Sequence, residues 1–241
     1  MKLGVRQGSV LSLFLFTIYV NDIIGRYVIG QRTFVVLYAN DILLISISIC
    51  ELQNLLRICE IELKWLNMAI NANKSCCMNI GPQCDTKCAN ITTADGSVLP
   101  WVNEIRYLGV FFVQSRNFKI SFDYAKRSFY RTSNAMLGKV DRFAAEPVVL
   151  QLFAKKCVPI LLYGLEACPL NKADKSSLDF VLNRFLMKLF NTGNFYIIEE
   201  CKVYFGIESL SSQLARKTEN FVKRFNVSSN ALCQFALNIN S

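Results

Sequence analysis

The chain has 241 residues, of which 52% are hydrophobic and 19% are charged, with only 11 Gly and 5 Pro. This composition is typical of a folded globular chain and excludes a disordered, collagen-like or low-complexity protein. The sequence contains no histidine, which excludes Ser-His-Asp and Cys-His nucleophiles, HExxH metalloproteases and Cys2His2 zinc fingers. A formal net charge of +9 makes a polyanion such as nucleic acid the first partner to consider.

The start of the chain and its cysteines predict a compartment. Charge appears within Met1–Arg6, before any apolar stretch, so no secretory signal is expected and the protein should be cytoplasmic or nuclear, not secreted. The 10 cysteines are spread over the whole sequence and are expected to be reduced thiols. No membrane association is predicted, because residues 11–20 are too few to span a bilayer and residues 34–50 are interrupted by Asn40-Asp41.

The first part of the chain mixes helical and strand patterns. A helix is expected over residues 9–27, and the Val- and Ile-rich stretch 33–50 predicts two buried strands joined by a tight turn near Ala39-Asn40. Apolar residues at helical spacing predict a helix over 51–68. The further elements are short strands over 76–80 and 90–93, a hairpin turn at Asp95-Gly96, and a strand over 107–113 bent around Gly109.

From residue 121 onward the pattern is almost entirely helical. The predicted helices cover residues 121–143, 146–163, 173–192, 195–204 and 209–225. A mixed front followed by an all-α back predicts an α+β fold with two domains, residues 1–118 and 119–241. Segment 115–156 carries +6 of the net charge, so basicity is concentrated at the start of the helical part.

The Asn40-Asp41 pair is the first candidate for chemistry. A carboxylate at the turn of an otherwise apolar hairpin is costly unless it is paired or holds a cation. Such a turn is also a rigid platform on which Mg2+ could be held beside a substrate. The pair can equally be a simple Asn-Asp turn signal, and the hairpin alone leaves both interpretations open.

Four motifs in a fixed order extend this interpretation. They are Gly4–Ser12, Phe34–Asp41, Trp65-Leu66-Asn67 with Asn73-Lys74-Ser75, and Ile105–Gly109. This succession resembles blocks B, C, D and E of the reverse transcriptases of LINE-type (non-LTR) retrotransposons. The likeness continues through Tyr163–Cys168 and so covers practically the whole chain.

The resemblance implies a partial right-hand polymerase palm, built of antiparallel strands with helices, followed by an all-α thumb. It implies RNA-templated DNA synthesis with two Mg2+ ions, an RNA template and a DNA primer. Carried over by position, the template and nucleotide residues are Arg6, Gln7, Gly8 and Tyr38, the residue beside the leaving pyrophosphate is Lys74, and the primer grip is Arg106, Tyr107, Leu108 and Gly109. The plainer alternatives are a turn with a helix cap, a solvated lysine, and an ordinary strand with a glycine kink.

Two departures from the family predict that polymerisation is lost. The family pattern at the hairpin is aromatic-Ala-Asp-Asp, but Asn40 stands at the first Asp position, which leaves Asp41 as the carboxylate of the pair. The upstream block A, with a further metal-binding Asp, has no counterpart in the sequence. We therefore expect Mg2+ not to be bound productively and the chain to be the inactive remnant of a truncated element.

The basic segment predicts a second activity. Lys126, Arg127 and Arg131 lie at helical spacing among aromatic residues, so they could track backbone phosphates without reading sequence. A solvated helix face is the alternative. Three functions thus stay open: a polymerase, a non-catalytic nucleic-acid-binding remnant, and a pseudogene product without selected function.

Overall fold

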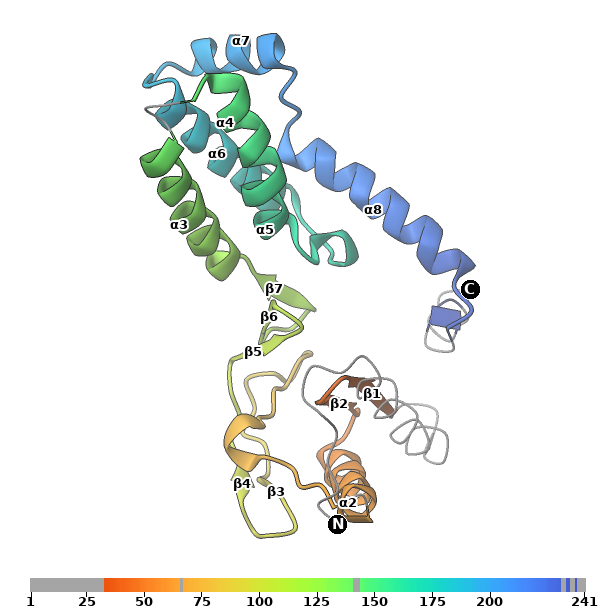
Figure 1. Ribbon diagram of the computed structural model, residues 1–241. Coiled ribbons are helices and arrows are strands. Elements are labelled where there is room, and N and C mark those ends of the chain that lie inside the picture. The colour runs from red at the N-terminus through yellow and green to blue at the C-terminus, as the bar shows by residue number, and fades with distance from the viewer. Residues whose placement is uncertain (1–32, 66, 141–143, 231–232, 235–236, 238–241) are drawn as a thin grey trace, which may run out of the picture. The chain divides into compact units, whose positions relative to one another are not determined.

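The computed structural model describes residues 33–65, 67–140, 144–230, 233–234 and 237 (Figure 1). The chain forms two compact units, Met1–Asn103 (unit 1) and Glu104–Ser241 (unit 2). The helix predicted over 9–27 lies outside the described residues. The domains predicted from the sequence, 1–118 and 119–241, stay a prediction, and the boundary between them falls within a small sheet of unit 2, before its last strand at Lys119–Ser121.

The described part of unit 1 begins with a β-hairpin. Strands β1 (Phe34–Tyr38) and β2 (Asp41–Ile45) pair antiparallel, from Phe34 opposite Ile45 to Tyr38 opposite Asp41. The predicted hairpin is therefore present, but the prediction that its strands are buried is wrong. Every residue of both strands is half-buried or exposed, because the apolar side chains are shared between two faces and only one face meets the following helix.

Helix α2 (Ile49–Trp65) follows the hairpin and agrees with the helix predicted over 51–68. Ser48 stabilises its start, since the Ser48 hydroxyl oxygen accepts a hydrogen bond from the Glu51 amide at 3.2 Å. The buried face of α2 is formed by Leu55, Leu56, Cys59 and Leu63, which recur at helical spacing. Leu56 belongs to a small core against which Leu44 of β2 also packs.

The rest of unit 1 consists of short elements: the 3-10 turn η1 (Ala72–Lys74) and the paired strands β3 (Ile91–Thr92) and β4 (Val98–Leu99). The predicted turn at Asp95-Gly96 joins β3 to β4, whereas the strand predicted over 76–80 is reduced to one bridge between Cys77 and Trp101. The Gln53 side chain anchors this region to α2, because its amide donates to the Thr92 carbonyl at 2.7 Å and accepts from the Thr92 amide at 2.8 Å.

Unit 2 opens with a three-stranded antiparallel sheet in the order β5-β6-β7. Its strands are β5 (Glu104–Tyr107), β6 (Val110–Val113) and β7 (Lys119–Ser121). The prediction of one bent strand over 107–113 is wrong. Leu108 and Gly109 form a two-residue hairpin loop between Tyr107 and Val110, which pair with each other.

Helices dominate the rest of unit 2 where the structure describes it, as the sequence predicts. They are α3 (Asp123–Val140), α4 (Glu146–Leu152), α5 (Val158–Leu162), α6 (Lys172–Leu189), α7 (Phe195–Phe205) and α8 (Leu210–Val227). Figure 1 shows α3, α4–α5 and α6 side by side, with α7 across one end of this group and α8 running away from it. The 3-10 turn η3 (Leu165–Ala167) connects α5 towards α6.

The helix predicted over 146–163 is interrupted. A π-helical turn, η2 (Phe153–Cys157), separates α4 from α5. Pro159 follows directly and has no amide hydrogen to donate to the carbonyl of Lys155, so the regular α-helical bond is missing there. The turn places Phe153 and Cys157 inside the core and leaves Lys155 and Lys156 exposed.

The core of unit 2 is built around three phenylalanines from different helices. Phe153 stacks on Phe185 of α6 with ring centroids 3.8 Å apart and meets Phe129 of α3 edge to face at 5.7 Å. All three are almost fully buried, at 3%, 4% and 0% exposure respectively. This core fixes α3 beside α6, which positions the groove described below.

No helix among the described parts of the chain is long and apolar enough to cross a lipid bilayer.

Candidate functional site

The β1–β2 turn presents the residues on which the catalytic prediction depends. Ala39 and Asn40 are the two loop residues, and Tyr38 and Asp41 face each other as the last pair of the ladder. Ala39 has a φ of 49°, the positive value that the first residue of a tight two-residue hairpin loop requires. All four residues are exposed, and Tyr38 reaches 61%. The turn is therefore an accessible platform, as the sequence predicts.

Among the described residues, this platform provides few donors for a divalent cation. Asp41 supplies one carboxylate, and Asn40 can offer only a neutral amide oxygen. Across the described segments, no three His, Cys, Asp or Glu side chains lie close enough together to hold a metal ion. Two bound Mg2+ ions need several negative oxygens to offset their charge, and the described part of the hairpin provides one such group.

The remaining site residues predicted in unit 1 are Lys74, Arg6, Gln7 and Gly8. Lys74 lies at the end of η1 with an exposed side chain, and it makes no ion pair to Asp41. Its predicted role beside a leaving pyrophosphate stays a prediction. Arg6, Gln7 and Gly8 lie outside the described residues.

The residues predicted to form a primer grip lie on a second tight hairpin, in unit 2. Leu108 and Gly109 have φ values of 49° and 85°, so both loop residues are left-handed, as in the mirror-image turn that matches strand twist. Glycine has no side-chain penalty at such a φ, which accounts for Gly109 at the second loop position. The prediction of Gly109 as a kink is therefore corrected to Gly109 as a loop residue.

Arg106 is held in place by two aromatic rings. Its guanidinium carbon lies 5.8 Å from the ring centroid of Phe111, its partner across the β5–β6 ladder, and 5.5 Å from that of Tyr124 at the start of α3. The two rings are themselves 4.8 Å apart. Cation–π contacts of this kind orient the guanidinium without neutralising it, so Arg106 keeps its charge for an external anion.

The β5–β6 hairpin contacts a motif more than fifty residues further along the chain. A methyl group on Gly109 would lie 3.0 Å from Cε1 of Tyr163, and one on Gly164 would lie 2.7 Å from Cγ2 of Val110. Gly164 also has a φ of 72°. The Ile105–Gly109 and Tyr163–Cys168 motifs therefore pack directly on each other, and both glycines are required by close approach.

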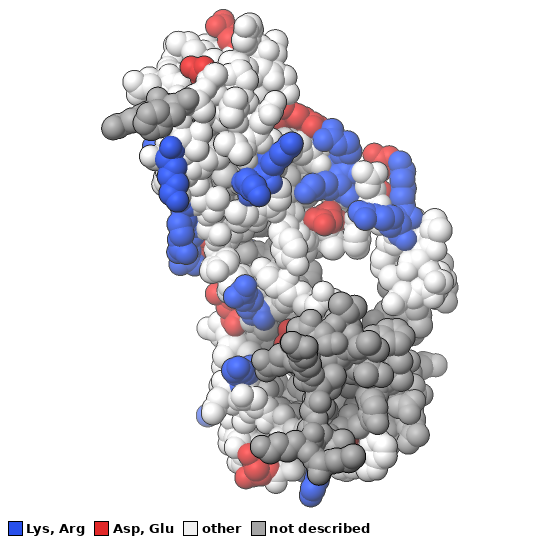
Figure 2. Space-filling model, viewed as in Figure 1, with Lys and Arg blue, Asp and Glu red and all other residues white. Residues whose placement is uncertain are grey.

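The predicted phosphate-binding residues of α3 do not share one environment. Arg127 and Arg131 are exposed, and Arg127 donates from Nε to the backbone carbonyl of Asp123 at 3.2 Å. Lys126 is half-buried, and its ammonium donates to the Ser177 hydroxyl of α6 at 2.6 Å. On the face seen in Figure 2, Lys and Arg side chains gather along α3 and along α8, where carboxylates lie among them.

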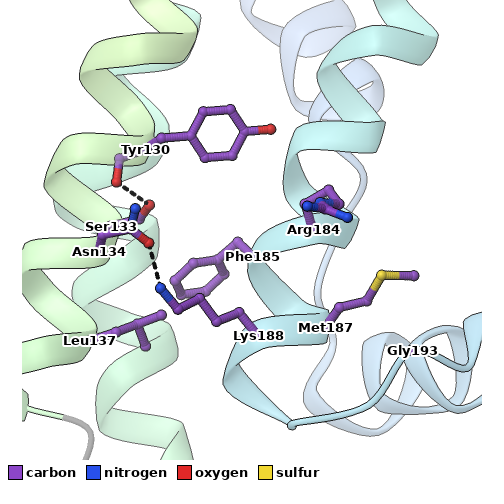
Figure 3. A pocket seen from close by; sticks show the side chains of 9 residues that line it. All are labelled: Tyr130, Ser133, Asn134, Leu137, Arg184, Phe185, Met187, Lys188 and Gly193. Atoms are coloured by element: carbon purple, nitrogen blue, oxygen red, sulfur yellow. Dashed lines mark hydrogen bonds between the residues drawn. The ribbon is translucent and has the colours of Figure 1, made fainter.

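Two basic residues of α6 that the sequence analysis did not select lie opposite α3. Arg184 and Lys188 line a groove of about 500 Å³ between the two helices, together with Tyr130 and Asn134 of α3 (Figure 3). The Lys188 ammonium donates to the Asn134 side-chain oxygen at 2.8 Å. Because Arg184 and Lys188 are four residues apart, the sequence could predict that they share one face of a helix. It could not predict that this face meets α3.

The comparison with protein families agrees with the geometry. Residues 1–112 match the model of the family described as reverse transcriptase (RNA-dependent DNA polymerase). This range includes the β1–β2 hairpin, Lys74 and the β5–β6 loop, so the predicted resemblance to a reverse transcriptase domain is supported over that part of the chain. The mixed fold with small antiparallel sheets is consistent with part of a polymerase palm. No curated protein and no solved structure matches the chain.

Proposed function

We propose that the chain is a LINE-type, non-LTR reverse transcriptase domain that has lost DNA synthesis and retains binding of nucleic acid. The observation that carries the proposal is the β1–β2 turn within the reverse transcriptase match, where Asn40 stands beside Asp41. On this proposal unit 1 derives from a palm and the helices of unit 2 from a thumb. The family's substrates, an RNA template with a DNA primer, become ligands that are bound and not extended.

Loss of synthesis follows from the charge at the turn. In a two-metal reaction the cations stabilise both the attacking and the leaving oxygen, and their carboxylate ligands hold them at the correct spacing. Replacing a carboxylate by an amide removes one negative charge next to the cations, which weakens their attraction by about 2 kcal/mol per ion even across about 4 Å of water. Asp41 alone does not supply the missing charge.

Retention of binding follows from a different part of the molecule. Unit 2 contains 19 Lys and Arg against 11 Asp and Glu, so it carries +8 of the net +9. Phosphate attraction depends on these cations and not on a metal. Arg106, Arg127 and Arg131 are exposed, and none forms an ion pair with any residue that the structure describes. They are therefore available to backbone phosphates.

The first test compares extension with binding in one preparation of the full chain. With oligo(dT) primed on poly(rA) and Mg2+, we expect no template-dependent incorporation of dTTP, although the same primer–template should bind. The Asn40→Asp variant should bind Mn2+ about tenfold more tightly than the parent, because it adds a carboxylate to the turn. Mn2+ affinity is measured by electron paramagnetic resonance. Incorporation by the parent chain would refute the loss of synthesis, and an unchanged Mn2+ affinity in the variant would show that residue 40 does not face the cation.

The second test is a salt titration of duplex binding by fluorescence anisotropy. Replacing Arg127 and Arg131 together by Ala should lower the affinity and flatten the slope of log K against log salt by up to about two units. Lys126 is left unchanged because its bond to Ser177 joins two helices. The Asp41→Ala variant is the matched control and should bind as the parent does. If the double variant keeps the parent's affinity and slope, α3 presents only a solvated face.

A further inference from the structure

We propose that the groove between α3 and α6 binds single-stranded nucleic acid, with backbone phosphates on Arg184 and Lys188 and one base against the ring of Tyr130. The inference rests on the nucleic-acid binding proposed above and adds a location and a preferred form of ligand. The groove belongs to unit 2 alone, and none of its lining residues belongs to either hairpin.

Two hydrogen bonds define the walls of the groove. Lys126 of α3 bonds to Ser177 of α6, and eight residues further along α3, Asn134 bonds to Lys188 of α6. Residue numbers increase on both helices from the first bond to the second, so α3 and α6 run parallel. The two bonds hold the helices together on either side of Tyr130. Beneath this opening lie Leu137 and Phe185, both buried, so the floor is apolar. The groove is thus preformed by the core and does not depend on a ligand.

Charge favours an anion in this groove. Arg184 and Lys188 are its charged lining residues, and no carboxylate lines it among the described residues. Both side chains are exposed, and neither forms an ion pair within the described ranges of the chain. The bond to Asn134 orients the Lys188 ammonium without cancelling its charge. Two cations one helical turn apart can contact successive phosphates of one strand.

The aromatic residue distinguishes a single strand from a duplex. Figure 3 shows the ring of Tyr130 directed from α3 across the groove towards α6. A volume of about 500 Å³ lies within the range of small-ligand sites, so a base can enter beside the ring. In a duplex the bases are already stacked on each other and present only their edges, whereas an unpaired base can stack on an aromatic side chain. Cations beside an aromatic ring are typical of sites that bind single-stranded nucleic acid.

The test measures anisotropy of a labelled 15-nucleotide oligo(dT) and of a 15-base-pair duplex with the full chain. Arg184→Gln with Lys188→Gln should flatten the single-strand salt slope by about 1.4 units, since each lost phosphate contact contributes about 0.7. Tyr130→Leu should weaken oligo(dT) binding at least about fivefold and leave the duplex affinity unchanged. The matched control is Lys175→Gln, an exposed lysine about 180° around α6 from Arg184, which should change neither.

Each possible result decides between the proposals. If the groove variants bind oligo(dT) as tightly as the parent, the groove is not the single-strand site. The proposed function would still stand if replacing Arg127 and Arg131 by Ala lowers the affinity for the duplex. A parent chain that binds neither nucleic acid would overturn both. Equal competition by polyglutamate and by unlabelled oligo(dT) would show a general anion site and refute the base contact. Thermal unfolding curves of Tyr130→Leu and of the Arg184→Gln, Lys188→Gln variant that match the parent's exclude misfolding as the cause of a loss.

Discussion

Phe153→Ala should lower the free energy of unfolding of unit 2 by about 3–5 kcal/mol, the range measured for large-to-small aromatic substitutions in cores. Phe153 is 3% exposed and lies between Phe129 and Phe185, so its removal leaves a cavity and deletes two aromatic contacts. Phe153 also belongs to the π-helical turn η2, and Pro159 at the start of α5 prevents a regular helix from closing over the space. Little collapse is therefore possible, and the cost should lie high in the range.

The measurement uses two signals that report on different units. Both tryptophans of the chain, Trp65 and Trp101, lie in unit 1, whereas most helical residues lie in unit 2. Far-UV circular dichroism in urea should therefore show the shifted transition of unit 2, and tryptophan fluorescence should follow unit 1. The matched control is Phe180→Ala, a phenylalanine of α6 that is 60% exposed and should change stability by no more than about 0.5 kcal/mol. Equal effects of the two variants would contradict the central position assigned to Phe153.

The helical part of the fold was largely predictable because its signals are local. Apolar residues at helical spacing and the Asn171–Asp174 capping box place the limits of α6 within a few residues of those predicted. The π-helical turn was not predictable from periodicity, because one additional residue shifts the pattern without ending it. The β5–β6 hairpin was missed for a similar reason. Leu108-Gly109 is a weaker hairpin signal than Asn-Gly, and a glycine inside an apolar strand also fits a kink.

For the candidate site as well, features set by neighbouring residues in the sequence were predictable, and features set by tertiary packing were not. The Val- and Ile-rich stretch around Asn40 was sufficient to predict the turn, and the order and spacing of the motifs were sufficient to predict the reverse transcriptase match, because both signals are read directly along the sequence. The environment of Lys126 was not predictable, since its partner Ser177 lies on a helix 51 residues away. The same packing creates the groove with Arg184, which no spacing in the sequence reveals. Helix faces could be predicted individually, but their pairing depends on the buried phenylalanines.

The close contacts at Gly109 and Gly164 hold the β5–β6 hairpin, which carries Arg106, against the Tyr163-Gly164 motif. Arg106 is positioned by the rings of Phe111 and Tyr124, and the strand that carries Phe111 also carries Val110, which touches Gly164. A displaced Val110 would therefore displace the ring beneath Arg106. The Tyr163-Gly164 motif thus supports the position of a cation that is exposed to ligand.

Gly164→Ala should destabilise unit 2 by about 2–6 kcal/mol. The residue has a φ of 72°, where a non-glycine residue costs about 1–3 kcal/mol, and its new methyl group would lie 2.7 Å from Cγ2 of Val110. Valine is stiff at χ1 and cannot rotate away cheaply, so overpacking adds a cost of about 1–3 kcal/mol. Gly138→Ala is the control of opposite sign. Gly138 is exposed on α3 with no atom near the added methyl group, and alanine should stabilise the helix there by about 0.5–1 kcal/mol.

A double-mutant cycle with Val110→Ala separates the two causes of the Gly164 effect. Shortening Val110 removes the overlap but not the backbone strain, so the double variant should be more stable than the sum of the single effects by about 1 kcal/mol or more. Urea unfolding followed by circular dichroism measures all four chains, and oligonucleotide anisotropy on the same samples shows whether Arg106 has lost its position. Strict additivity would mean that Gly164 is required only for its φ. A Gly164→Ala variant as stable as the parent would contradict the close approach of the two motifs altogether.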